Sequence, residues 1–169
     1  MEPVLVDAGC GLASRHGRCH DLGDRPYLLA VGSANVLTEG DLSAWEVDWR
    51  RRYRGRALAV VRPADTAQVA AVLQCAAKHK TPVIPVSGLT GLVGGAMTNG
   101  GLMLSVERLN RIREIRPAAR IAVVEAGCIL ANVHEAADAA GMVFPLTFGA
   151  RGSAMIGGAL ATNAGGSNV

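Results

Sequence analysis

Glycine and hydroxyl residues are concentrated in one short stretch of this chain, Pro85-Val86-Ser87-Gly88-Leu89-Thr90-Gly91-Leu92-Val93-Gly94-Gly95. With few bulky side chains over its backbone, such a loop can turn several N–H groups towards one point. A concave row of N–H groups binds anions, and phosphate is the usual biological occupant. The stretch therefore predicts a phosphate-binding loop. The alternative is a mobile glycine-rich hairpin that binds nothing.

The two common nucleotide-binding motifs do not fit this loop. A P-loop requires Lys and then Ser or Thr after its last glycine, but Ala96 and Met97 stand there. A dinucleotide fingerprint requires G-x-G-x-x-G at the start of a helix, and Gly88, Gly91 and Gly94 have a different spacing. We therefore expect the loop's own amides to hold the anion.

A second glycine-rich stretch covers residues 149–166. Ser153 is placed to cap a short helix, whose free amides would add to an anion site. Gly157 and Gly158 allow a backbone or a ring to approach closely, and Thr162-Asn163 supplies donors and acceptors. Two such stretches, each following a strand, favour a shared ligand over two idle loops.

A strand-helix-strand unit is predicted to position the first loop. Residues 58–61 are typical of a buried strand, and Asp65 with Gln68 has capping-box spacing at the start of a helix that runs to about residue 79. The strand 83–86 follows. Such units are parallel and right-handed, so the loop lies at the carboxyl edge of a sheet, where open α/β sheets bind ligands.

Further elements follow the first loop. Residues 102–106 and 121–125 are predicted strands, with a short extended stretch near Ile115 between them. Apolar residues at helical spacing predict a second amphipathic helix over 130–140, which Gly141 ends.

Composition bounds the function classes. The 169 residues suit one globular domain, since half are apolar and 18% are charged. A net charge of +3 gives no strong case for nucleic acid. A local basic run is expected to be a solvent-exposed approach to the first strand, with a polyanion patch as the alternative. It comprises Arg50, Arg51, Arg52, Arg54 and Arg56.

The N-terminal residues 1–36 form a poorly defined segment. Four of its residues, Cys10, His16, Cys19 and His20, lie close in sequence, but their spacing matches no established zinc pattern. The start lacks a secretion signal, and no segment is long enough to span a membrane, so the predicted location is cytoplasmic. Cys75 and Cys128 are expected in the core.

From about residue 37 onwards the chain resembles the FAD-linked oxidases of the p-cresol methylhydroxylase and vanillyl-alcohol oxidase superfamily. The most similar branch is the FAD-dependent D-2-hydroxyacid dehydrogenases, which include D-2-hydroxyglutarate dehydrogenase, D-lactate dehydrogenase and the glycolate oxidase flavoprotein subunit. The segments that carry the resemblance are Asp48-Trp49-Arg50 with Arg52-Tyr53-Arg54-Gly55, Ala59-Val60-Val61-Arg62-Pro63, Thr90-Gly91-Leu92-Val93-Gly94-Gly95, and Ile156-Gly157-Gly158 with Thr162-Asn163-Ala164-Gly165-Gly166.

This resemblance implies an α+β FAD-binding domain, of which residues 37–169 are the N-terminal portion. In the family the first loop wraps the FAD pyrophosphate and the second stretch lines the pyrophosphate and the flavin ring. The implied cofactor-binding residues are Pro85, Val86, Ser87, Gly88, Leu89, Thr90, Gly91, Leu92, Gly94, Gly149, Ser153, Gly157, Gly158, Thr162, Asn163 and Ala164. No metal site is assigned.

Two departures from the family pattern matter. The family loop usually reads Pro-Gln-Gly-Gly-Asn-Thr-Gly, whereas Val86, Ser87 and Leu89 replace Gln, Gly and Asn. Ser87 would be strained if its φ were positive, and Leu89 argues against a covalent flavin link, so non-covalent FAD is expected.

The second departure is length, since the family's substrate domain, which binds the hydroxyacid and carries the catalytic base, has no counterpart in these residues. The four histidines match no family base: they are His16, His20, His79 and His134. No catalytic residue is therefore assigned. Three hypotheses remain for the chain. It is part of a D-2-hydroxyacid dehydrogenase, a remnant that no longer binds FAD, or a fragment of a nicotinamide-dependent reductase of the same flavin fold.

Overall fold

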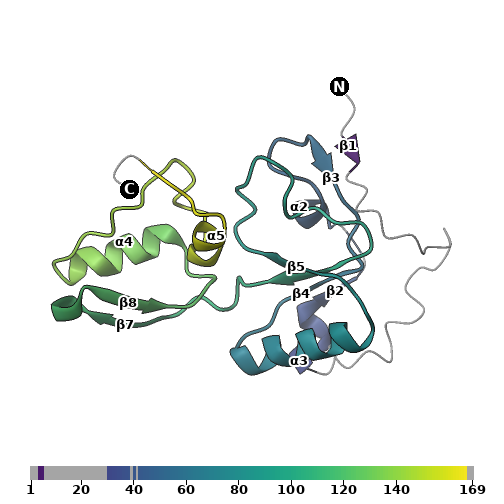
Figure 1. Cartoon of the computed structure of the whole chain (residues 1–169), viewed down its shortest axis with the longest axis horizontal. Coiled ribbons are helices and arrows are strands. Elements are labelled where there is room, and N and C mark those ends of the chain that lie inside the picture. Colours follow the sequence, from purple (N-terminus) through teal and green to yellow (C-terminus); the bar gives the residue numbers. More distant parts are fainter. Residues whose placement is uncertain (1–3, 6–29, 39, 41, 167–169) are drawn as a thin grey trace.

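The computed structural model describes residues 4–5, 30–38, 40 and 42–166. Figure 1 shows two lobes, one around the main sheet and one around a β-hairpin with a helix above it. In chain order the first lobe contains β1 (Val4–Leu5), a 3-10 turn η1 (Ser33–Asn35), β2 (Val36–Leu37), α2 (Ser43–Glu46), β3 (Tyr53–Arg54), β4 (Ala59–Val61), α3 (Thr66–Lys78), β5 (Val83–Val86) and β6 (Leu102–Ser105). The second contains β7 (Ile112–Arg116), η2 (Pro117–Ala119), β8 (Ile121–Val124), α4 (Leu130–Ala139) and α5 (Ile156–Ala161).

The main sheet has the strand order β2-β4-β6-β5. β4, β6 and β5 run parallel, and β2 pairs antiparallel with β4. The predicted strand-helix-strand unit β4-α3-β5 is confirmed, with the later strand β6 inserted between its two strands. The carboxyl ends of β4, β5 and β6 therefore meet at one edge of the sheet, and the first glycine loop leaves from that edge.

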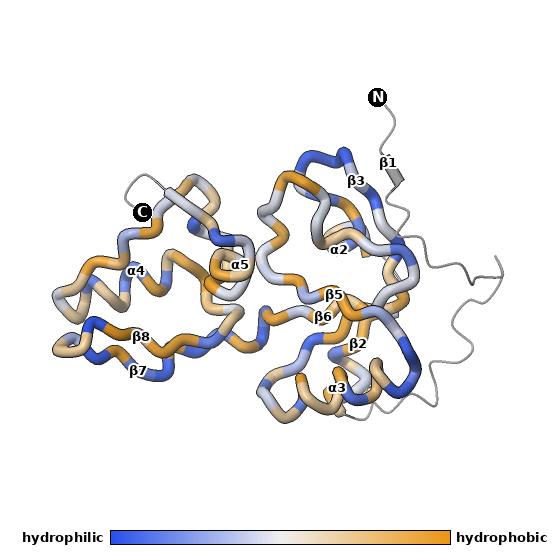
Figure 2. The backbone as a smooth tube through the Cα atoms, viewed as in Figure 1, coloured by the Kyte–Doolittle hydropathy of each residue, from blue (hydrophilic) through white to orange (hydrophobic). Residues whose placement is uncertain are grey.

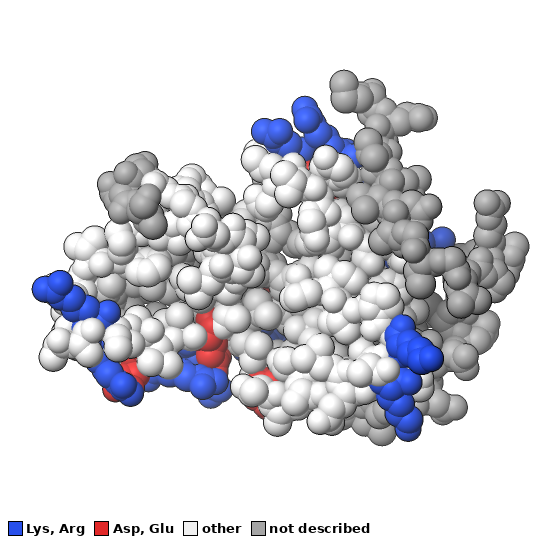
Figure 3. Space-filling view, in the orientation of Figure 1, with Lys and Arg blue, Asp and Glu red and all other residues white. Residues whose placement is uncertain are grey.

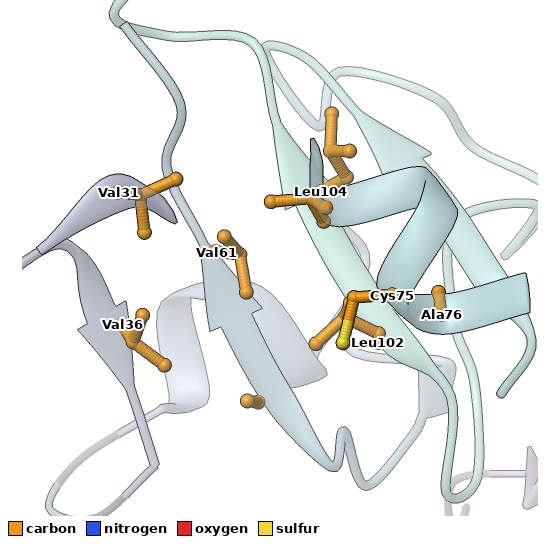
Figure 4. Packing of buried hydrophobic residues seen from close by; sticks show 9 residues of the cluster. Val31, Val36, Val61, Cys75, Ala76, Leu102 and Leu104 are labelled. Carbon is orange, nitrogen blue, oxygen red and sulfur yellow. The ribbon is translucent and has the colours of Figure 1, made fainter. Parts of the chain in front are cut away.

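Side chains point alternately to the two faces of this sheet, and each face is covered by its own cluster of apolar residues. Ala59, Val61, Leu102 and Leu104 pack on the side of α3, together with Val31, Val36, Val72, Cys75 and Ala76 (Figure 4). Val60, Met103 and Val86 pack on the other side, against Met97 and partly buried residues that include Trp45, Tyr53 and Leu89. Period-two alternation thus builds two clusters on one thin sheet.

Helix α3 begins with the predicted capping arrangement. The Asp65 carboxylate accepts a hydrogen bond of 2.8 Å from the Gln68 N–H, and the Gln68 side-chain oxygen accepts one of 2.7 Å from the Ala64 N–H. The return bond therefore goes one residue earlier than in a standard capping box. The side chains of Asp65 and Gln68 thus each bond a backbone N–H at the start of α3.

A buried aspartate organises the basic run. Asp48 is 4% exposed. Its carboxylate accepts hydrogen bonds from the backbone N–H groups of Tyr53 (2.7 Å) and Arg50 (3.1 Å). Burial raises the pKa of Asp48, but backbone N–H groups of Tyr53, Arg50 and Arg52 outweigh it and lower the pKa below its usual value. The arginines of the run are exposed, as predicted, and Trp49 between them is 75% exposed.

The second lobe is a hairpin covered on one side by α4 and α5. β7 and β8 pair antiparallel, and Arg120 in the connection adopts the left-handed conformation with φ 54°. A cluster of Cys128, Leu130, Val133, Leu146, Ile156 and Ala159 forms its core. Figure 2 shows apolar segments along β8 and around α5. The short extended stretch predicted near Ile115 is a complete strand.

The N-terminal prediction is only partly covered by the structure. Val31 and Val36 lie in the core against α3, so residues from 30 onwards contribute to the sheet lobe. The Cys10, His16, Cys19 and His20 group lies outside the described residues. Among the residues described, no group of His, Cys, Asp and Glu side chains could hold a metal ion.

Candidate cofactor site

The first glycine loop is the crossover from β5 to β6. In the described part of the chain, no residue from 87 to 95 donates its backbone N–H to another group. Only at Met97 does the turn close, with a 3.0 Å bond from its N–H to the Gly94 carbonyl. A run of amides without internal partners is what an anion-binding loop requires, because an anion supplies the missing acceptors.

Backbone strain in this loop falls at Leu89 and not at Ser87. Leu89 has φ 51°, in the left-handed region, whereas Ser87 is absent from the positive-φ residues. The condition under which Ser87 would be strained is therefore not met. A leucine in this conformation lacks the local hydrogen bond that makes Asn tolerable there. Its side chain packs against the Val60, Met97 and Met103 cluster, which offsets part of the cost.

The second stretch differs from its prediction at Ser153. The residue that caps α5 is Met155, without a side-chain hydrogen bond, and the Ser153 hydroxyl lies 3.4 Å from the Ala150 carbonyl. Ser153 belongs to the preceding turn, two residues too early to reach the helix amides. The predicted cap is therefore wrong.

The first amides of α5 are also already used. The Ile156 N–H donates to the Cys128 carbonyl (2.9 Å) and the Gly157 N–H to the Ala126 carbonyl (2.8 Å). They cannot extend an anion site as expected from the sequence. The helix contributes close approach of its glycine backbone instead.

The turn before α4 is a part of the site that the sequence did not indicate. Besides the two bonds to α5, the Leu130 N–H donates to the Ala154 carbonyl (2.9 Å) and the Ala131 N–H to the Arg151 carbonyl (3.0 Å). The N–H groups at the starts of α4 and α5 thus find acceptors in the backbone carbonyls of the segment that precedes the other helix. The only sequence signal was Gly127, where a Cβ would overlap the Val106 carbonyl.

The two glycine stretches touch each other directly. A Cβ at Gly88 would overlap the Ser153 carbonyl oxygen and lie 3.1 Å from Ala154 Cα. A Cβ at Gly158 would overlap the Ser87 hydroxyl. In Figure 1 the loop after β5 and the helix α5 face each other where the two lobes meet. The structure therefore brings together the Ser87–Gly88 and Ser153–Gly158 portions of the predicted site.

The remaining predicted residues are arranged more loosely. The Thr162 hydroxyl donates to the Gly158 carbonyl (2.8 Å), so it serves the end of α5. Asn163 is exposed with φ 49°, and Ala164 packs on the core of the second lobe. Val86 is buried, so only its backbone can face a ligand. Pro85 is exposed, Thr90 half-buried, Leu92 43% exposed and Gly94 has φ 70°.

No described histidine is placed as a base at this contact. His79 caps the end of α3 and is exposed. His134 lies on α4, where its Nε2 is 2.8 Å from the Leu146 carbonyl and its ring is tilted against Phe144. His79 thus ends α3 through its backbone, and the His134 ring has a local structural role.

The site carries almost no formal charge. Residues 85–97 contain no Lys or Arg, and residues 149–166 contain only Arg151. In Figure 3 the face over α4, α5 and the neighbouring loop is largely uncharged, while basic side chains gather near β3 and around β7 and β8. A bound anion would therefore be stabilised by backbone amide dipoles and not by cations.

A buried carboxylate between β8 and α4 is held by arginines of the hairpin. Glu125 is buried and bonds the Arg111 side chain (3.0 and 3.2 Å), the Arg111 N–H (3.0 Å) and Arg113 (3.0 Å). The side-chain and backbone bonds from Arg111, together with Arg113, outweigh burial and lower the pKa of Glu125 to about 2. This carboxylate joins β7 to β8 and stays ionised at neutral pH.

Residues 57–169 match a family model described as an FAD binding domain. The match covers most of the chain. The chain belongs to the FAD binding domain family. FAD is thus the cofactor of this domain, as the resemblance implied.

Curated relatives agree with this family. D-2-hydroxyglutarate dehydrogenase of Xanthomonas citri pv. viticola is 44% identical over 142 residues, which is 83% of this chain and 30% of the relative. A putative mitochondrial D-lactate dehydrogenase of Schizosaccharomyces pombe is 35% identical over 139 residues, 82% of this chain and 26% of the relative. The FAD binding domain described here spans about 30% or less of the length of these relatives.

Solved structures confirm the fold class. Alkyldihydroxyacetonephosphate synthase superposes with a TM-score of 0.70 at 16% identity, covering 79% of this chain and 30% of that protein. p-Cresol methylhydroxylase superposes with a TM-score of 0.60 at 22% identity, and the match covers 75% of this chain and 26% of that protein. The α+β, p-cresol methylhydroxylase-type architecture predicted from the sequence is therefore confirmed.

The residues of this FAD binding domain fit the pyrophosphate part of its cofactor. Nothing lies within 4 Å of a Cβ added at Gly91, Gly95, Gly149 or Gly152. Packing within the described residues does not require glycine at these positions, and their backbone is open to a ligand. Open glycines and unpartnered amides on the same loop suit a phosphate group.

Proposed function

We propose that this chain forms part of the FAD cradle of a flavin-dependent oxidoreductase that oxidises a D-2-hydroxy acid. The observation that carries the proposal is the row of unpartnered amides at residues 87–95, in contact with the second glycine stretch through Gly88 and Gly158. When bound, FAD would accept the hydride from the substrate carbon. The chain would bind and orient the cofactor, and no base is assigned to it.

The geometry supports the following cofactor-binding roles as part of this proposal. The amides of Ser87, Gly88 and Thr90–Gly95 would hold the pyrophosphate, and the Thr90 hydroxyl would add a donor. Gly149, Gly157 and Gly158 would let the nucleotide lie against the backbone, and Asn163 would supply an exposed amide group. Val86 and Leu89 would contribute only through their backbone, since their side chains belong to the core.

The substrate class rests on the relatives. Those named above are D-2-hydroxyglutarate and D-lactate dehydrogenases, so a small D-2-hydroxy acid is the proposed substrate of the whole protein. Cytoplasmic location stays a prediction, and several matched relatives are described as mitochondrial. In the part of the chain described, no helix has both the length and the apolar composition to cross a membrane.

A titration of the purified full chain with FAD tests the proposal. We expect a shifted, structured visible absorption band and quenched flavin fluorescence. ADP carries the pyrophosphate without the flavin ring, so it should compete with FAD, whereas riboflavin should not. Failure to retain any FAD would favour the remnant that no longer binds FAD. FAD binding that riboflavin displaces and ADP does not would contradict the assignment of the loop to the pyrophosphate.

A further inference from the structure

The contact between the two glycine stretches has two points of different chemical kind. At the first point, Gly88 faces the backbone carbonyl of Ser153. At the second point, Gly158 faces the side chain of Ser87, with its added Cβ overlapping the hydroxyl and lying 3.2 Å from the Ser87 Cβ. Each stretch thus contributes one glycine that makes room for the other. Only the second point can be changed by altering the opposing side chain.

Apart from the backbone N–H proposed to hold the pyrophosphate, no group of Ser87 has a hydrogen-bonding role in the described part of the chain. Its hydroxyl makes no hydrogen bond there, it is half-buried, and its φ is not positive. The position therefore does not require glycine for backbone reasons, and the serine is accommodated without strain. What Ser87 does is fill the space that the missing side chain of Gly158 leaves open.

The consequence concerns the spacing of the lobes. Ser87 directly follows β5 of the sheet lobe, and Gly158 lies on α5, whose first amides are fixed to the turn before α4. Because α5 is tied to the second lobe and Ser87 to the first, the van der Waals contact between them limits how closely the two lobes approach. A larger or smaller combined volume at this contact changes the width of the cradle.

We propose that Ser87 and Gly158 form a size-matched pair that sets the separation of the two halves of the cradle and thereby the affinity for FAD. Ser87 is then a positioning residue that acts through its volume. The proposal rests on the proposed function, since it concerns the same FAD site. Close-packed contacts respond to a change of one methyl group, so the effect is measurable.

A double-mutant cycle on the full chain tests this pair. The dissociation constant for FAD is measured by fluorescence quenching for the wild type, Gly158→Ala, Ser87→Gly and the double variant. We expect Gly158→Ala to weaken FAD binding several-fold, because the Ser87 hydroxyl must turn away and the Ser87 Cβ still lies 3.2 Å from the added methyl. Ser87→Gly should also weaken it several-fold. The double variant should recover to within about threefold of the wild type, because the total volume is nearly restored.

Two further variants serve as references. Gly88→Ala should weaken binding at least tenfold, but Ser153→Gly should not rescue it, because Gly88 meets a backbone carbonyl that every residue has. Gly165→Ala adds a methyl group where nothing lies within 4 Å, at a position outside the assigned cofactor-binding residues, so it controls for loss of backbone freedom in the second stretch. Ser87→Ala keeps the Cβ and removes the hydroxyl, and a smaller loss than for Ser87→Gly is expected.

Several results would overturn the proposal. Additive losses in the double variant would show that the two positions are independent. A loss for Ser87→Ala as large as for Ser87→Gly would assign the effect to the hydroxyl and not to volume. If the wild type retains no FAD, the proposed function fails, and the same four chains are compared by urea unfolding. Rescue of the unfolding midpoint in the double variant would support the spacer contact, and additivity would refute it.

Discussion

The two lobes differ in how completely their β-strands are covered. In the sheet lobe, Val60, Val61, Leu102 and Met103 are fully buried, and side chains pack on both faces of the sheet. In the hairpin lobe, Ile121 is 48% exposed and Val123 37% exposed. An open groove of about 660 Å³ lies between the hairpin and the two helices, lined mostly by apolar residues.

This difference teaches how the cradle is built. The closed lobe supplies the amide-rich loop from the edge of a sheet that is covered on both faces, and Leu89 is the one non-glycine residue of that loop with a positive φ. The open lobe supplies α5, whose position depends on backbone bonds between 126–131 and 151–157. Burial is the main stabilising term in the first lobe, whereas the second lobe buries fewer apolar side chains, and backbone hydrogen bonds fix the positions of its helices.

Truncation of matched apolar residues should show the largest contrast. Leu102→Ala in β6 removes a fully buried side chain and should lower the free energy of unfolding by about 2–5 kcal/mol. Ile121→Ala in β8 removes a half-exposed side chain and should cost less than about 1 kcal/mol. Urea unfolding of both variants, followed by far-UV circular dichroism, measures the difference. Equal losses would contradict the contrast between a closed and an open lobe.

The sequence predicted the closed lobe better than the open one. Continuous apolar runs around Val60 and Met103 and the Asp65–Gln68 spacing are local signals, and the predicted strands and helix are confirmed. The starts of α4 and α5 bond each other through main-chain groups, which every residue possesses, so no residue type marks them. That is why Ser153 was wrongly predicted as a cap.

The φ of Leu89 and Ser87 could not be predicted for a related reason. Their residue types indicate which conformation would be costly, but tertiary packing decides which one occurs. Leu89 adopts the costly conformation because its side chain then reaches the cluster of Val60, Met97 and Met103. The contact between Ser87 and Gly158 joins residues far apart in sequence, and their spacing alone does not reveal it.

Acid should open the hairpin lobe before the sheet lobe. The pKa of Glu125 is about 2 in the folded chain, held down mainly by Arg111 and then by Arg113, against an ordinary value of 4.5. A depressed pKa contributes stability above the ordinary value and loses it as pH falls towards the folded value. The contribution of Glu125 is therefore full above about pH 4.5 and disappears between pH 4.5 and 2.

Amide hydrogen exchange in β7 and β8 measures this loss, and the fluorescence of Trp45 and Trp49 reports on the sheet lobe. We expect exchange in the hairpin to accelerate in this pH range before the fluorescence changes. Glu125→Gln should lower protection at neutral pH and remove the acid step. The matched control is Glu114→Gln, whose pKa is also lowered by an arginine, Arg116, but in an exposed pair that contributes little. If amide protection in the hairpin and the folded-state fluorescence of the sheet lobe are lost at the same pH, the prediction is contradicted.

Substitutions of Leu89 should have the smallest effect on stability, and the polar variant Leu89→Asn should be more stable than the apolar variant Leu89→Val. Leu89→Asn relieves about 1 kcal/mol of left-handed backbone cost and loses about as much apolar burial for a half-buried side chain. Its net change in the free energy of unfolding should stay within about 1 kcal/mol. Leu89→Val keeps an apolar side chain but places a β-branched residue at φ 51°, so it should destabilise more than Asn does. Urea unfolding of the two variants distinguishes the causes. If Val is tolerated better than Asn, apolar packing and not backbone conformation controls this position, and the loop of the closed lobe carries no backbone strain of consequence.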